Sequence, residues 1–158
     1  MKKVKTILAT LLLLAGVTPV ITSCSDDNKE PESPAAQSVA GSYTDMMTCT
    51  VAGSESEFEN LTFTLTPTDD NTVTVVTPSF GNPPMKMPQI TVSGVKVTGT
   101  DGTYTLAPTE FNGTTDSGKT YSGTLRGSFE NNTLKIDFQL NYGAMPMPLI
   151  CSFESKKL

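Results

Sequence analysis

Alternation of apolar and polar residues is the feature that most constrains this chain. In residues 134–142 every second side chain is apolar, and the side chains between them are polar or charged. This period of two places the apolar residues on one face of a β-strand, whereas no helical pattern lasts two turns. From Gly41 onward we therefore expect an all-β domain whose strands occupy residues 41–51, 58–66, 71–78, 87–99 (kinked near Gly94), 102–108, 119–129, 132–142 and 146–155.

Short polar turns separate these strands. Asp101-Gly102 and Asn131-Asn132 are residue pairs typical of two-residue hairpin turns. Eight sequential antiparallel strands can close into an up-and-down barrel, and closure removes the exposed sheet edges. We expect such a barrel over residues 41–158, with a β-sandwich as the alternative.

Two cysteines bear on the choice between barrel and sandwich. Cys49 lies in the first expected strand and Cys151 in the last, each on an apolar face. In a closed barrel those strands are antiparallel neighbours, so the two thiols could meet and form a disulfide. The alternative is that both cysteines are reduced and buried as small apolar residues.

The N-terminal residues have the pattern of an export signal. Three lysines precede an apolar stretch over residues 7–21, which is too interrupted to be a spanning helix of roughly 20 residues. Ile21-Thr22-Ser23-Cys24 resembles a lipobox, which implies cleavage before Cys24 and a lipid anchor on that cysteine. We expect a signal peptide over residues 1–23 and a flexible Ser-, Pro- and acid-rich tether over residues 24–40.

Residues 25–28 suggest where the anchored protein resides. Ser25-Asp26-Asp27-Asn28 resembles the signal that sends lipoproteins of Bacteroides-type bacteria to the cell surface. The resemblance implies a lipid-anchored outer membrane protein that is exposed on the cell surface. A periplasm-facing position, with these residues acting only as tether, is the alternative.

Several short segments carry a resemblance to a known domain. In chain order they are residues 41–44, 70–75, 94–97, 102–106 and 132–136, which read GSYT, DNTVTV, GVKV, GTYTL and NTLKI. Together they resemble the calycin-like β-barrel domain of lipoproteins from Bacteroides-type bacteria. The resemblance implies a lipocalin-related cup that could take a small apolar ligand, and it brings no catalytic motif. Lipocalins have a Gly-x-Trp motif in their first strand, but this chain has no tryptophan and Tyr43 lies near that place.

Charge and composition exclude several kinds of function. The net charge is −5, and loss of the three leader lysines makes it more negative, so nucleic acid is not an expected partner. The chain has no histidine, which removes the commonest general base and the commonest transition-metal ligand. We expect no catalytic residues, no cofactor and no metal, and we expect the row Glu55, Glu57 and Glu59 to be a solvated strand face.

Two sets of residues are candidates for ligand binding. The first is the aromatic side chains expected inside the barrel: Tyr43, Phe63, Tyr104, Tyr121, Phe129 and Phe138. They either fill the interior or line a cavity, and Gly123 and Gly127 either create space or permit curvature. The second set belongs to a repeated Met-x-Met-Pro-x-Ile pattern at the start of two even-numbered strands: Met85, Met87, Met145 and Met147. These methionines would ring one mouth of the barrel as a plug, an adaptable ligand rim or a soft Cu(I) site.

Two functions follow from these features. The first is a membrane-anchored, non-catalytic accessory or structural protein whose barrel contacts another surface protein. The alternative is a binding module that holds a small apolar or amphipathic molecule in the barrel.

Substitution of the anchoring cysteine tests the membrane attachment. Cys24→Ala removes the thiol that would carry the lipid, so the precursor stays unlipidated and the exported protein appears in the soluble fraction. Carbonate washing of membranes followed by immunoblotting measures this shift. If the variant stays in the washed membranes, the signal is an uncleaved anchor.

Overall fold

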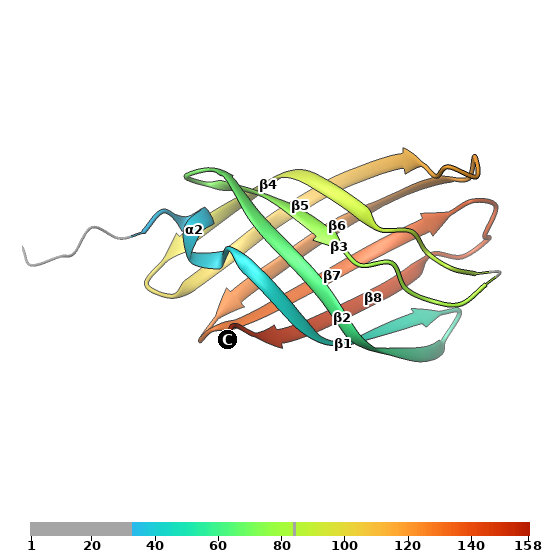
Figure 1. The fold of residues 1–158 in the computed structure, drawn as a ribbon, viewed down its shortest axis with the longest axis horizontal. Coiled ribbons are helices and arrows are strands. Elements are labelled where there is room, and N and C mark those ends of the chain that lie inside the picture. The colour runs from blue at the N-terminus through green and yellow to red at the C-terminus, as the bar shows by residue number, and fades with distance from the viewer. Residues whose placement is uncertain (1–32, 84) are drawn as a thin grey trace, which may run out of the picture. The chain divides into compact units, whose positions relative to one another are not determined.

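The eight strands pair in sequence order, and the last strand returns to the first, so the sheet closes into an antiparallel barrel (Figure 1). This computed structural model describes residues 33–83 and 85–158, so the leader, Cys24 and residues 24–32 of the expected tether lie outside the described residues. The closed eight-stranded barrel expected from the sequence is confirmed. Its strands are β1 (Gly41–Val51), β2 (Ser54–Asp69), β3 (Thr72–Thr77), β4 (Ile90–Thr100), β5 (Thr103–Thr114), β6 (Thr120–Glu130), β7 (Thr133–Tyr142) and β8 (Leu149–Lys156).

Two strands begin later than expected, because prolines precede them. β4 begins at Ile90 rather than at residue 87, and β8 begins at Leu149 rather than at residue 146. Pro88 and Pro148 each lack the backbone N–H that a ladder hydrogen bond needs. Both Met-Pro segments therefore belong to loops at one end of the barrel.

Other strands are longer than the sequence pattern indicates. β5 continues to Thr114 although it was expected to end at residue 108. The register with β6 shifts between Leu106 and Thr109, and Pro108 is accommodated within that irregularity. The kink expected near Gly94 is present. Gly94 has φ +75°, and the β3–β4 register shifts opposite it.

The turns are those that the sequence predicts. Asn131 and Asn132 have φ values of 51° and 62°, and Asp101 and Gly102 have φ values of 52° and 82°. Two successive residues with positive φ characterise the tight turn that matches the twist of a hairpin. These pairs join β6 to β7 and β4 to β5 and thereby set the register of both hairpins.

A short helix, α2 (Ala35–Val39), lies against the barrel at the end that contains these turns. Ala36 and Val39 are fully buried. The Ala36 N–H donates to the Asp70 carbonyl oxygen at 3.0 Å, and the Tyr43 hydroxyl donates to the Val39 carbonyl oxygen at 2.8 Å. The helix therefore seals this end of the barrel.

The helix occupies residues that were expected to be tether. The tether was expected to run to residue 40, whereas the compact unit begins at Ser33 and α2 is ordered against β2, β3 and β4. A helix of five residues is too short to show the apolar periodicity by which helices are recognised. Only its contacts with the barrel reveal it.

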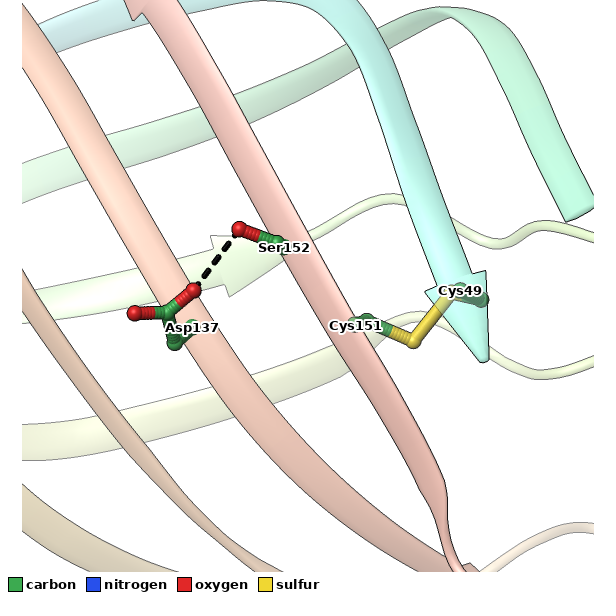
Figure 2. Close-up of a disulfide and its surroundings, with 4 residues drawn as sticks. All are labelled: Cys49, Asp137, Cys151 and Ser152. Carbon is green, nitrogen blue, oxygen red and sulfur yellow. Dashed lines mark hydrogen bonds between the residues drawn. A yellow bond between two sulfur atoms is a disulfide. The ribbon is translucent and has the colours of Figure 1, made fainter. Parts of the chain in front are cut away.

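β1 and β8 form the seam that closes the sheet. Their register pairs Met47 with Phe153 and Cys49 with Cys151. A disulfide joins these two cysteines, whose Cα atoms are 4.1 Å apart and which are 102 residues apart in the sequence (Figure 2). The ladder of this seam covers only residues 47–50 of β1, so the disulfide adds a covalent link to a short ladder.

Loss of the disulfide should destabilise the barrel. Replacing both Cys49 and Cys151 with Ala removes a link whose chain-entropy value for a loop of this size is up to about 4.7 kcal/mol. We expect a lower melting temperature for the double variant in thermal scans followed by circular dichroism. A reductant should lower the melting temperature of the unsubstituted protein and leave that of the double variant unchanged. Equal melting temperatures of the unsubstituted protein with and without reductant would contradict the link.

Ionisation of Tyr43 should make stability depend on alkaline pH. Burial raises the pKa of the Tyr43 phenol from its usual 10.0 to about 12. Because the folded state holds this proton more tightly than the unfolded state, its contribution is complete below pH 10 and is lost as the pH rises from 10 towards 12. Urea unfolding between pH 8 and pH 11.5 should show this loss, and Tyr43→Phe should reduce it while costing about 1 kcal/mol at neutral pH. An identical pH dependence in the variant would refute the assignment.

Candidate functional site

Aromatic side chains fill the interior of the barrel. Five of the six expected aromatic side chains are buried and at most 8% exposed: Tyr43, Phe63, Tyr104, Phe129 and Phe138. Neighbouring aromatic rings in the interior have centroids 4.3 to 6.4 Å apart. Tyr121 differs from them, because it is half-buried and borders a shallow polar depression on the strands β5, β6 and β7. These five buried aromatic residues therefore act as core.

The rings continue from the middle of the barrel to its far end. Phe63 stacks on Phe153 with centroids 4.3 Å apart and lies 6.2 Å from Phe138. Phe138 lies 6.4 Å from Phe80, which in turn lies 5.4 Å from Phe58. A ligand consequently cannot occupy the centre of the barrel without displacing this column, and Phe58 and Phe80 end it at the mouth.

The two glycines of β6 permit close packing and do not leave a cavity. A Cβ atom at Gly123 would overlap the carbonyl oxygen of Gln139 and the ring of Phe111. A Cβ atom at Gly127 would crowd the carbonyl oxygen of Lys135. The space beside β6 is thus already occupied by backbone and by side chains of its neighbours.

The loop between β3 and β4 folds back over the mouth. The Phe80 N–H donates to the Met87 carbonyl oxygen at 3.2 Å, and the Met87 N–H donates to the Phe80 carbonyl oxygen at 2.8 Å. Between them Gly81 has φ +84°, where a Cβ atom would lie 2.9 Å from the Met85 carbonyl oxygen. This small hairpin buries the side chains of Phe80 and Met87 to 4% and 2% exposure.

An open pocket of about 380 Å³ lies at this mouth. Its walls come from the end of β1, the start of β2 and the loops before β4 and β8, and none of its side chains is charged. The lining residues are Cys49, Val51, Ser56, Phe58, Phe80, Gly81, Asn82, Met85, Met87, Met145 and Leu149. An apolar surface with two polar side chains, Ser56 and Asn82, is typical of a site for a small apolar molecule.

Three of the four expected rim methionines contribute to this pocket. Met87 forms part of its buried wall, Met145 is half-buried, and Met85 is 52% exposed. Met147 is 47% exposed and does not line the pocket. Prolines flank Met147 and β8 begins only at Leu149, so the alternation of a strand does not carry this side chain inward.

The disulfide belongs to the same wall, because Cys49 lines the pocket while Cys151 is fully buried behind it. The structure thus brings both cysteines and three methionines to one end of the barrel. A thioether is flexible and polarisable, so methionines let a pocket wall adapt to ligands of different shape.

Several pocket residues were not among the site residues expected from the sequence. Phe58 and Val51 were placed in strands without a role, and Phe80 and Asn82 lay in an expected loop. The sequence signal for the loop residues was Phe80 beside Gly81, because a loop that buries an aromatic side chain must turn back on the core. The pattern could not show over which part of the barrel that loop would fold.

Polar side chains form a ladder on the outer wall. The Ser152 hydroxyl donates to Asp137 Oδ1 at 2.7 Å (Figure 2). Arg126 Nε lies 4.0 Å from Asp137 Oδ2. Lys135 and Glu154 form a second ion pair on the same strands, and the Glu154 carboxylate raises the pKa of Lys135. All these groups are exposed, so they contribute little to stability. They lie outside the barrel and away from the mouth pocket.

The described residues contain neither a cluster of metal ligands nor a spanning helix. Within residues 33–83 and 85–158, no three histidine, cysteine, aspartate or glutamate side chains gather as metal ligands would. No helix in that part of the chain is long and apolar enough to cross a membrane. The mouth pocket is therefore the candidate site.

Comparison with one crystal structure supports the barrel architecture. A crystal structure of a proposed outer membrane protein from Bacteroides fragilis superposes with a TM-score of 0.67 at 24% identity, and the match covers 79% of this chain and 53% of that one. The chain thus spans about half the length of that relative. A redesigned β-barrel matches at 18% identity with a TM-score of 0.40, covering 79% of this chain and 96% of the designed one. No curated protein shows significant similarity to this chain.

The sequence itself matches a family model, that of the calycin-like beta-barrel domain, over residues 39–156. This match covers every strand of the barrel. Since it extends over more than half of the chain and agrees with the closed eight-stranded sheet, the chain belongs to the calycin-like β-barrel domain family.

Proposed function

We propose that this protein is a lipid-anchored, surface-exposed outer membrane protein with a non-catalytic accessory role, and that it binds a small apolar or amphipathic group at the mouth of its barrel. The anchor is supported by the lipobox-like residues that end in Cys24. The outer membrane is supported by the similarity to the proposed outer membrane protein from Bacteroides fragilis.

The mouth pocket is the observation that carries the binding function. Its volume of about 380 Å³ lies within the range of about 300–1,000 Å³ that small-molecule sites have. Ser56 and Asn82 offer hydrogen bonds at the edge of an apolar wall, which suits a ligand with one polar end. The aromatic column places this ligand at the rim, in contrast to the deep cup that the lipocalin resemblance implies.

The chemistry of the pocket supports binding over catalysis. No side chain in its wall is a carboxylate, an amine or a free thiol. A general acid or base within hydrogen-bonding reach of a bound ligand would have to come from outside this wall. An accessory protein that retains a ligand needs no such group.

The position of the mouth also suits capture of a ligand. The chain enters the described domain at α2, whereas the loops that precede β4 and β8 lie at the opposite end of the barrel (Figure 1). These loops contribute to the wall of the pocket. Attachment through residues that precede α2 would therefore leave the mouth at the end remote from the attachment point.

An uncharged amphipathic fluorophore tests the site. N-phenyl-1-naphthylamine brightens in apolar surroundings, so titration of the purified whole protein gives a dissociation constant. Met85→Lys places a charge in the pocket wall and should weaken binding about tenfold or more, which corresponds to about 1.4 kcal/mol. Met147→Lys is the matched control, because it adds the same charge nearby but outside the pocket, and it should bind as the unsubstituted protein does. Equal weakening by both substitutions, or by neither, would exclude the mouth pocket.

A further inference from the structure

β2 has an edge that no other strand covers. On one side it pairs with β1 along residues 54–65, but on the other side its pairing with β3 begins only at Thr64. β3 ends at Thr77 and Pro78 follows, so the chain leaves the sheet before it reaches the first part of β2. Within the described residues, residues 54–58 and 61–63 are therefore paired with β1 only, and Glu59 and Asn60 form a bulge between them in which Asn60 has φ 56°.

A groove of about 560 Å³ runs along this edge. It separates β2 from the β3–β4 loop, and its lining residues are Glu57, Phe58, Glu59, Leu61, Phe80, Gly81 and Asn82. Phe58 and Leu61 are half-buried, while Glu57 and Glu59 are exposed. The groove thus combines an apolar floor with an acidic border, next to an uncovered strand.

The charge of this edge distinguishes between possible occupants. Glu55, Glu57 and Glu59 are exposed, and neither ion pair of the described residues involves them. A second copy of the chain would bring these carboxylates against identical carboxylates, and charged residues on an edge strand discourage such pairing. Residues 25–32 of the chain contain four acidic residues and a single lysine, so they are no better match. A basic segment of a different protein complements the edge.

We propose that the β2 edge and its groove bind an extended, basic peptide segment of another protein as an added β-strand. Addition of a strand derives its affinity from main-chain hydrogen bonds and its specificity from alternate side chains. In such a segment, an apolar side chain would face Phe58, and the basic side chains on either side of it would face Glu57 and Glu59. The site goes beyond ligand binding at the mouth, although both share Phe58 and the β3–β4 loop.

Three synthetic peptides of eight residues test separately the roles of charge and of main-chain hydrogen bonds in binding. One alternates Val with Lys, the second alternates Val with Glu, and the third is the Val-Lys peptide with alternate backbone amides N-methylated. Fluorescence polarisation with the whole exported protein in nonionic detergent gives the affinities. We expect the Val-Lys peptide to bind about tenfold or more tightly than either of the others, because each lacks the charge or the backbone donors.

Charge substitutions in the protein locate the binding site. Glu57→Lys with Glu59→Lys should weaken binding of the Val-Lys peptide about tenfold or more. The matched control is Glu110→Lys with Glu130→Lys, which makes the same change of charge on the exposed surface of β5 and β6 and should alter binding less than threefold, or about 0.6 kcal/mol. If the lysine pair at β2 does not fold, Glu57→Gln with Glu59→Gln keeps the side-chain shape and should still weaken binding.

Several results would overturn the proposal. Equal binding of the three peptides would exclude strand addition, and equal effects of the two lysine pairs would exclude the β2 edge. No binding of the Val-Lys peptide at millimolar concentration would exclude the site. Self-association in sedimentation experiments that is altered by substitution of Glu57 and Glu59 would assign the edge to a second copy. Titration with the naphthylamine probe measures binding at the mouth pocket separately. Failure of one site is therefore distinguishable from failure of the other.

Discussion

Aromatic side chains fill the barrel, and their contacts join strands that are not neighbours in the sheet. Phe63 of β2 stacks on Phe153 of β8 and lies beside Phe138 of β7, while Tyr43 and Phe129 pack below the helix that seals one end. The packed interior determines which parts of the molecule can bind a ligand. Because the centre holds side chains, binding is left to the open end, where the column ends at Phe58 and Phe80, and to the outer surfaces.

Much of the barrel could be predicted from the sequence, because local rules determine it. The alternation in β7, the paired asparagines before it and the position of one cysteine in each terminal strand indicate strand, turn and closure without knowledge of distant contacts. The helix α2, the fold of the β3–β4 loop and the late start of β3–β2 pairing could not be predicted. Each depends on which part of the barrel a segment meets, and neither periodicity nor turn chemistry contains that information. Phe80, for example, is a loop residue by sequence and a core residue by position.

The two candidate binding surfaces lie on either side of one loop and differ in their chemistry. The mouth pocket is apolar and uncharged, whereas the groove beside β2 is bordered by carboxylates. Phe80, Gly81 and Asn82 line both. A substitution at Gly81 would strain the positive φ of this loop and would therefore disturb both surfaces together, whereas changes at Met85 or Glu59 should affect them separately.

The pairing of β1 with β8 also governs the order in which the molecule can assemble. The seam joins residues about a hundred positions apart, so it cannot form until the last strand has been synthesised. Contacts of such long sequence separation slow folding, because loop-closure entropy is lost before the contacts form. Until closure, β1 and β8 are both open edges that can pair with other chains. The yield of native protein should therefore fall as chains with an unclosed barrel accumulate, and the disulfide should form only after the ladder has brought its two cysteines together.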